Sequence, residues 1–265
     1  MVLKHDKSNY VTKSFGKSAL VKPDESLRNW YQTPLGQYLL EQIKIKLDPI
    51  LSTSFGYYAV HLGCMESTSF IKQLCPVKHV FTMGQLPGQD DVLIDRASLP
   101  VAADSVDLVI LMHSLSSSRH PHAILREVNR VLIPDGKLII IDFNPVSLWG
   151  LRHGLQSWLD DAPWAGHYYT ATRLRDWTRL LGFDQLLDTR CGYVLPLNYQ
   201  SLLERSHLFS KFTQRWLSFS GALNILAFEK RLFPLTPARK RWAQRQILSP
   251  KIARPTVGRG MKYDK

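Results

Sequence analysis

An acid, an imidazole and an amide, Asp95, His113 and Asn144, each follow a short apolar run of the sequence. If these runs are parallel strands, the three side chains stand at the carboxyl ends, where open α/β sheets bind their ligands. The sequence therefore predicts a ligand site at this edge. For Asn144 a second interpretation stays open, in which it turns the chain toward the next helix, while Trp149 and Arg152 shape a pocket wall.

Other kinds of site lack their sequence signatures. The histidines do not cluster at metal-ligand spacing on any one helix, which argues against a metal centre. The chain has no Gly-x-x-x-x-Gly-Lys phosphate loop and no nucleophile elbow of a serine hydrolase. Cys64, Cys75 and Cys191 have no paired spacing for zinc or for a disulfide framework, so we expect a reduced, cytoplasmic compartment.

A βαβ unit is the element that must position the site. Val106–Met112 and Leu138–Phe143 are almost continuously apolar, as expected of strands buried on both faces of a parallel sheet. A helix with proline in its first turn is predicted between them, from Pro121 to Leu132, and Pro134–Gly136 makes a turn. The apolar residues of the inner helix face recur at helical spacing: Ile124, Leu125, Val128, Val131 and Leu132.

The remaining elements complete an α/β fold with a doubly wound, mostly parallel seven-stranded sheet. Further strands are predicted over 55–62, 77–82, 91–95, 185–191 and 223–229, with helices over 70–74, 147–159 and 170–181. In the last helix, Leu174, Trp177, Leu180 and Leu181 are expected to point inward and Gly182 to end it. An amphipathic helical insertion is predicted over Leu202–Trp216.

An N-terminal helix precedes the sheet. Thr33 is a candidate N-cap followed by Pro34 at the first helical position, and apolar residues then recur at spacings of three or four up to Ile50. The helix is expected to pack one face on the domain, and a role as a cover of the active site is the alternative.

The two ends of the chain differ from its middle in composition. We expect a flexible N-terminal arm over residues 1–25, one domain over 26–232, and a basic tail that contains prolines over 233–265. Lys230–Lys265 holds eleven Lys and Arg against one acid, so +10 of the net charge of +12 belongs to this end. Four prolines prevent it from forming one long helix.

The basic end suggests weak contact with a polyanion through residues 230–265. Nucleic acid and an anionic membrane surface are the two candidates, and a solvated tail without a partner is the alternative. No apolar stretch approaches about 18 residues, so we expect no transmembrane segment.

The middle of the chain resembles the class I S-adenosylmethionine-dependent methyltransferases, in the branch with small-molecule methylases. A closer resemblance is to the YafS-like methyltransferases. The matching segments of the broader family are Asp95–Pro100, Asp104–Asp107, Leu125–Leu132 and Ile133–Gly136. Those of the closer group are Phe143–Arg152, Thr33–Gly36 and Leu235–Pro237.

The resemblance implies a Rossmann-like methyltransferase fold over roughly residues 30 to 230, with S-adenosylmethionine as cofactor. It places Gly63 and Cys64 in the turn against the methionine end of the cofactor. It places Asp95, followed by Arg96, at the adenine and His113 near the methyl group and substrate. A cap on local backbone amides is the alternative for Asp95, a partly buried structural histidine for His113, and a small buried hydrophobe for Cys64.

The chain departs from the family pattern at two places. Met65 and Ser67 stand where the family has further glycines, and His61 replaces an acid before Gly63. The second strand ends at Gly84 without the carboxylate that usually binds the ribose.

These observations predict a methyltransferase that acts on a small or medium-sized molecule. Methyl transfer depends mainly on in-line positioning, so it needs few acid–base residues, and His113 is the one catalytic candidate. Two alternatives stay open: a catalytically degenerate binding or scaffold protein of the same fold, and a nucleic-acid-associated protein anchored by its tail.

Overall fold

The computed structural model describes residues 22–63, 68–85, 90–156, 163–164, 166–194, 196 and 220–231. All of them lie in the unit Met1–Phe233. Residues 1–21, the predicted insertion Leu202–Trp216 and the tail 233–265 lie outside the described residues. Among the residues described, no helix is long and apolar enough to cross a membrane.

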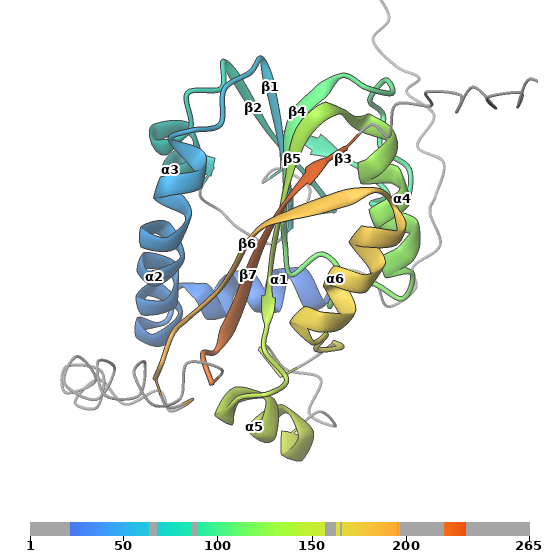
Figure 1. Ribbon diagram of the computed structural model, residues 1–265. Coiled ribbons are helices and arrows are strands. Elements are labelled where there is room, and N and C mark those ends of the chain that lie inside the picture. The colour runs from blue at the N-terminus through green and yellow to red at the C-terminus, as the bar shows by residue number, and fades with distance from the viewer. Residues whose placement is uncertain are drawn as a thin grey trace, which may run out of the picture. The chain divides into compact units, whose positions relative to one another are not determined.

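Seven strands form one sheet in the order β3-β2-β1-β4-β5-β7-β6 (Figure 1). Strands β1 to β5 pair in parallel, and β7 runs antiparallel between β5 and β6. The strand order therefore reverses between β1 and β4, which makes the switch point of a doubly wound sheet. The predicted fold class is confirmed. The strands are β1 (Tyr58–Gly63), β2 (His79–Gly84), β3 (Val92–Leu93), β4 (Val106–Met112), β5 (Leu132–Phe143), β6 (Phe183–Cys191) and β7 (Leu223–Lys230).

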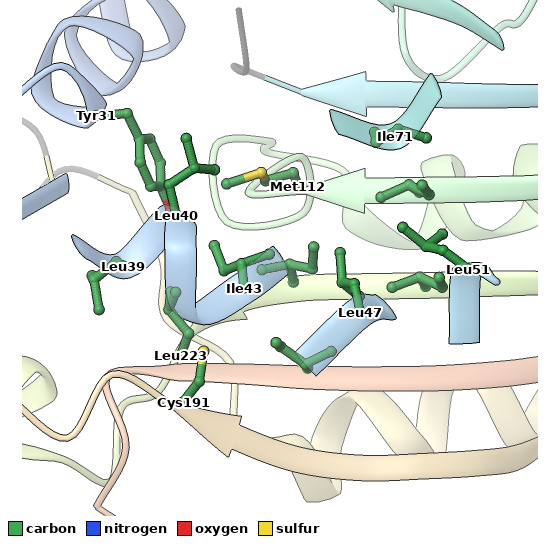
Figure 2. Packing of buried hydrophobic residues seen from close by; sticks show 14 of the residues in the cluster. Tyr31, Leu39, Leu40, Ile43, Leu47, Leu51, Ile71, Met112, Cys191 and Leu223 are labelled. Atoms are coloured by element: carbon green, nitrogen blue, oxygen red, sulfur yellow. The ribbon is translucent and has the colours of Figure 1, made fainter. Parts of the chain in front are cut away.

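The central strands are buried on both faces, as their unbroken apolar runs predict. Leu108, Ile110 and Met112 of β4 face one core, and Val109 and Leu111 face the other. The first core includes helix α2 (Pro34–Leu51) and the start of β7 (Figure 2). The second includes α4 (Pro121–Val131) and α6 (Ala171–Leu180).

The helices follow their predicted starts closely. Thr33 caps α2 by accepting a hydrogen bond from Gly36 N at 3.2 Å. The helices α3 (Thr68–Leu74) and α5 (Leu148–Gln156) also occupy predicted positions. One inward assignment in α6 is wrong, because Leu180 is 86% exposed. Leu180 is the last residue of α6, directly before the C-cap Leu181. Thr178 is buried on the inner face instead.

The helix α1 (Lys22–Tyr31) was not predicted. It begins inside the range expected for the N-terminal arm and buries Leu27, Arg28 and Tyr31. Only Gln32 and Thr33 separate it from α2, and a side chain on Gly36 would clash with the backbone of Tyr31. The two helices are therefore packed closely, and α1 lies at the carboxyl ends of the parallel strands (Figure 1).

Candidate active site

Buried polar side chains gather at the carboxyl ends of β1, β4 and β5. Burying such groups costs free energy unless they are paired or serve a function, so their concentration at one edge marks a candidate site. Each of the following side chains belongs to a residue that is at most 5% exposed: Arg28, His61, Arg96, His113, Ser114, Ser116 and Asp142.

His113 stands at the centre of this edge, directly after β4. Its φ is +54°, a left-handed conformation that non-glycine residues seldom adopt, and its backbone N donates to Ile141 O at 2.9 Å. The imidazole stacks on Phe143 with a centroid separation of 4.4 Å. The sheet and the turn thus hold the ring in one orientation.

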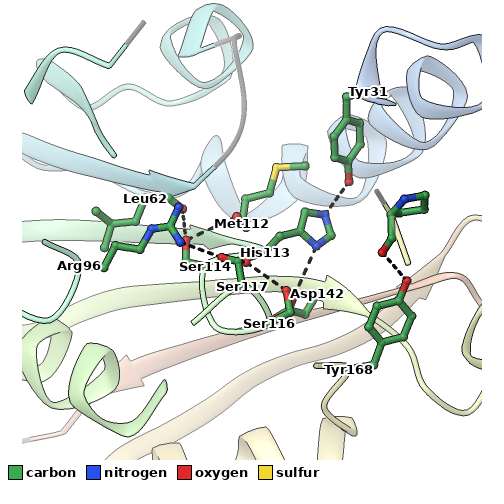
Figure 3. Close-up of polar contacts among 11 residues, drawn as sticks. Tyr31, Leu62, Arg96, Met112, His113, Ser114, Ser116, Ser117, Asp142 and Tyr168 are labelled. Atoms are coloured by element: carbon green, nitrogen blue, oxygen red, sulfur yellow. Dashed lines mark hydrogen bonds and ion pairs between the residues drawn. The ribbon is translucent and has the colours of Figure 1, made fainter. Parts of the chain in front are cut away.

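Both ring nitrogens of His113 face side chains from distant parts of the chain (Figure 3). Nε2 lies 2.6 Å from the hydroxyl of Tyr31 on α1. Nδ1 lies 3.4 Å from a carboxylate oxygen of Asp142 on β5, and the side chains of His113 and Asp142 are each 1% exposed. The structure therefore lines up a phenol, an imidazole and a carboxylate, of which only His113 was predicted.

The serine-rich loop after His113 connects the predicted site residues (Figure 3). Ser114 Oγ donates to Leu62 O at 2.6 Å, beside Gly63. Ser117 Oγ donates to His113 O at 2.8 Å and accepts from Arg96 Nη1 at 2.7 Å. The loop thus brings Gly63, Arg96 and His113 into one cluster.

Gly63 ends β1 with φ +141°. A Cβ at this position would overlap the carbonyl oxygen of Met112, so no larger residue fits. The chain therefore presents bare backbone where β1 meets β4. Cys64 lies outside the described residues.

Asp95 and Asn144 make local contacts. The carboxylate of Asp95 is exposed and accepts from Ala97 N at 3.0 Å, so it caps its own turn, and contact with adenine stays a prediction. Asn144 is buried: its Nδ2 donates to Gly221 O and its Oδ1 accepts from Val146 N. Asn144 thus has the turn-forming role that the sequence left open.

The predicted pocket wall after Asn144 is also largely structural. Trp149 is 1% exposed, and its Nε1 donates to Val194 O at 2.9 Å. The guanidinium of Arg152 stands over the ring of Trp164 at 4.6 Å from its centroid. These residues fix the chain beyond β5.

His61 of β1 is a buried polar residue at the same edge. Neither of its ring nitrogens has a hydrogen-bond partner among the described residues. Burial, with the positive charges of Arg28 and Arg96, lowers the pKa of His61 to about 4. The imidazole is therefore neutral near pH 7.

A carboxylate that the sequence did not indicate lies at the end of β2. Asp90 pairs with Arg28 Nη2 at 3.8 Å, and its side chain is 2% exposed. A Cβ on Gly84 would overlap this carboxylate, so Asp90 packs directly against the last residue of β2. Strand β2 has no carboxylate of its own at its end, and Asp90, which follows β2 in the sequence, places one beside Gly84.

No group of three or more His, Cys, Asp or Glu side chains that could hold a metal ion occurs within the described residues.

Comparison with known proteins identifies the family. A family model for a methyltransferase domain matches residues 47–187. The chain belongs to this methyltransferase family. The protein YafS of Escherichia coli K12 is 31% identical over 207 residues, which cover 78% of this chain and 82% of YafS. S-adenosylmethionine is the cofactor that the family and its solved structures imply.

Solved structures share the fold. A chain from the complex of the Haloferax volcanii Trm112 methyltransferase activator with its methyltransferase matches with a TM-score of 0.57 at 15% identity, covering 79% of this chain and 98% of that one. A methyltransferase of Thermotoga maritima gives a TM-score of 0.53 at 15% identity, with 71% and 88% covered. A methyltransferase of Mesorhizobium loti gives a TM-score of 0.52 at 15% identity, and the match covers 70% of this chain and 96% of that one.

The residues at the carboxyl edge fit S-adenosylmethionine. Gly63 lets the end of β1 lie directly against the carbonyl of Met112, and the orphaned nitrogens of His61 can take hydrogen bonds. Asp90 offers a carboxylate beside β2 despite the missing acid at the strand end. Arg96, which follows β3, and Ser117, which follows β4, add a hydrogen-bonded basic and polar pair to the same edge.

Proposed function

We propose that this protein is an active methyltransferase that transfers the methyl group of S-adenosylmethionine to a small or medium-sized molecule. The observation that carries the proposal is the position of His113, held between Tyr31 and Asp142 at the switch point of a methyltransferase fold. A scaffold protein has no need of a buried imidazole aligned with a carboxylate at this edge.

The cofactor would be held by residues on both sides of the switch point. Gly63 receives its methionine end, and Asp90 accepts hydrogen bonds from the ribose hydroxyls. Asp95 and Arg96 stand at the adenine. Cys64 belongs to the same turn as Gly63. In this arrangement the cofactor supplies an electrophilic methyl group, and the protein aligns the acceptor with it and excludes water.

Titration calorimetry with S-adenosylmethionine and S-adenosylhomocysteine tests the proposal. We expect saturable binding of both and a rise in the melting temperature, because a ligand at a hundredfold excess over its Kd stabilises the fold by about 2.7 kcal/mol. Incubation with methyl-tritiated S-adenosylmethionine and a small-molecule extract should then label an extractable product. The absence of heat and of any thermal shift at millimolar cofactor would contradict the proposal.

A non-catalytic protein of the same fold is the second candidate. The observation in its favour is that α1 places Tyr31 and Arg28 over the edge where a cofactor binds. Binding of both ligands without a labelled product in any extract favours this candidate.

A further inference from the structure

We propose that the methyl acceptor is an aromatic hydroxyl compound, a phenol, which binds where the ring of Tyr31 lies and gives its proton to His113. This inference rests on the proposed function and deepens it by naming the acceptor class. Its starting point is that the phenol of Tyr31 is bound to Nε2 of His113 at 2.6 Å.

The orientation of His113 makes Nε2 the proton acceptor. Nδ1 of His113 faces a carboxylate oxygen of Asp142 at 3.4 Å, without hydrogen-bond geometry. A proton on Nδ1 points toward this carboxylate, so the proposal places the ring proton there. Nε2 then has a free lone pair and accepts from the hydroxyl of Tyr31. In the proposal His113 is a general base, and the nearby carboxylate of Asp142 stabilises its protonated form.

A general base selects among acceptor classes. A neutral amine attacks with its own lone pair and can lose its proton afterwards, whereas a neutral hydroxyl is a weak nucleophile until its proton is removed. The acceptor oxygen forms the new O–C bond, the C–S bond breaks with its electron pair left on sulfur, and the acceptor proton passes to Nε2. The products are a methyl ether and a neutral thioether, so atoms and charge balance with no further reactant.

The surroundings of Tyr31 suit a planar ring. Its centroid lies 5.0 Å from that of Trp30 and 5.7 Å from that of His113. Leu40 and Met112 belong to the same buried cluster (Figure 2). Aromatic neighbours in edge and offset contacts, with one polar group at the end, are the features of a site for a phenol.

Tyr31 is the last residue of α1, and Arg28 of the same helix pairs with Asp90 at 3.8 Å. A movement of this helix end withdraws the phenol of Tyr31 and leaves the imidazole with an empty ring-shaped site. In this view Tyr31 occupies the place of the acceptor until the acceptor displaces it.

The experiment uses the full chain with the substitution Tyr31→Gly. The probe is p-cresol, which is the side chain of tyrosine as a free molecule, and toluene is the matched control because it lacks the hydroxyl. S-adenosylhomocysteine binding is measured first in every variant. We expect p-cresol to bind Tyr31→Gly at least about tenfold more tightly than it binds the wild type, since cavities left by a deleted ring accept ligands of its shape. Toluene should bind more weakly than p-cresol.

With S-adenosylmethionine present, Tyr31→Gly should convert p-cresol to 4-methylanisole. Adding His113→Gln should lower product formation about 10²-fold, the usual contribution of a general base, while S-adenosylhomocysteine still binds. If Tyr31→Gly fails to fold, Tyr31→Phe decides the question, because it keeps the ring and removes only the competing hydroxyl. The proposal then requires p-cresol to bind Tyr31→Phe more tightly than the wild type.

Two results overturn the inference. One is p-cresol binding that is no tighter in either variant than in the wild type. The other is p-cresol bound to a variant that also binds the cofactor but forms no ether. In both cases the methyltransferase proposal stands, because it is tested separately, by the binding of S-adenosylmethionine and S-adenosylhomocysteine to the wild type and by the labelled product.

Discussion

His61 is a buried imidazole in the middle of a parallel sheet, where its neighbours in the same strand are apolar. It is 1% exposed and paired in register with Ile110 of β4. Its burial favours the neutral form, and the guanidinium groups of Arg28 and Arg96 act in the same direction. Burial without hydrogen-bond partners costs stability at any pH, and protonation of the ring in acid adds a further cost.

Stability should fall as the pH drops from about 6.5 to about 4, because the unfolded chain takes up the proton of His61 first. The pKa of His61 is lowered to about 4 in the folded protein. Below about pH 4 the whole difference between the pKa of His61 in the unfolded chain and in the folded protein has been lost as stability. It corresponds to about 3 kcal/mol of unfolding free energy. Urea unfolding of the wild type and His61→Leu at pH 7 and pH 4 measures it. The loss of unfolding free energy between pH 7 and pH 4 should be smaller in His61→Leu than in His79→Leu, which is a control at an exposed histidine. Equal losses in the two variants would contradict the lowered pKa of His61.

Asp90 and Asp91 are adjacent carboxylates with different partners. Asp90 is buried against Gly84, whereas Asp91 accepts from both the backbone N and the Oγ1 of Thr82 at 2.7 Å. These hydrogen bonds lower the pKa of Asp91. Of these two carboxylates, only Asp90 belongs to the cofactor site proposed above.

Asp90→Asn should weaken S-adenosylhomocysteine binding by about 1.5–3 kcal/mol, which is one to two decades in Kd, because it removes a charged acceptor from the ribose hydroxyls. Asp91→Asn is the matched control and should leave the Kd unchanged within about threefold. The 2′,3′-dideoxy analogue of the ligand, which lacks both ribose hydroxyls, should bind wild type and Asp90→Asn with similar Kd values. A dideoxy analogue that still distinguishes the two proteins would place the ribose elsewhere.

At the scale of elements, single acids fix where strands begin and how helices sit. Asp107 on β4 accepts from Tyr57 N at 2.8 Å and from Tyr58 N at 2.9 Å, so it aligns the start of β1 with its neighbour. Glu127 on α4 accepts from Leu99 N at 2.9 Å and thereby ties the helix to the segment after β3. These contacts set the relative positions of the strand ends at the other edge.

Asp107→Ala should lower the free energy of unfolding by about 1–3 kcal/mol, the sum of two backbone hydrogen bonds at about 0.5–1.5 kcal/mol each. Chemical denaturation measures the change. Asp176→Ala, at an exposed acid of α6, is the control and should lower stability by less than about 0.5 kcal/mol. A loss no larger than that of the control would show that the β1 start is held by its apolar neighbours alone.

The helix α1 is the element that the sequence concealed. Its apolar residues, Leu27, Trp30 and Tyr31, are too few to give a helical pattern, and the segment before it is polar and basic. The helix is held by tertiary contacts, namely the packing of Leu27 and Tyr31 in the first core and the polar contacts of Arg28 and Tyr31. The sequence offered an active-site cover only as an alternative role for the next helix, α2, and that role stays a prediction.

Across the whole molecule, the positive charge divides between the domain and the tail. Lys230 donates to Asp104 at 2.7 Å and to Leu132 O at 2.6 Å, and Arg231 pairs with Asp184 at 3.1 Å. These first two basic residues of the predicted polyanion segment are thus engaged in the domain. The contact with a polyanion stays a prediction for the basic residues that follow, which lie outside the described residues.

Deleting residues 234–265 should remove nonspecific RNA binding at low salt, because most of the excess charge is in that segment. If about five phosphates are neutralised, the full chain should give a log–log salt slope of roughly −4. Filter binding of a mixed-sequence RNA and sedimentation with anionic vesicles distinguish the two candidate polyanions. The tail prediction is wrong if the truncated chain binds both as well as the full chain.

The sequence by itself determined the architecture and one catalytic candidate. Unbroken apolar runs such as Val106–Met112 identify strands buried on both faces, because a strand with one wet face alternates. Local signals also sufficed for the cap at Thr33 and for the position of His113 after its strand. Such features depend on residues within a few positions of one another, so they can be read without the fold.

Only the tertiary structure decided which groups meet. Tyr31, His113 and Asp142 come from a helix, a strand end and a neighbouring strand, and 82 residues separate Tyr31 from His113. In the sequence Asp142 is one acid in an apolar run, and Asp90 is one of two acids in a loop. Their roles arise because parallel pairing brings the carboxyl ends of distant strands to one edge, and no local pattern records that pairing.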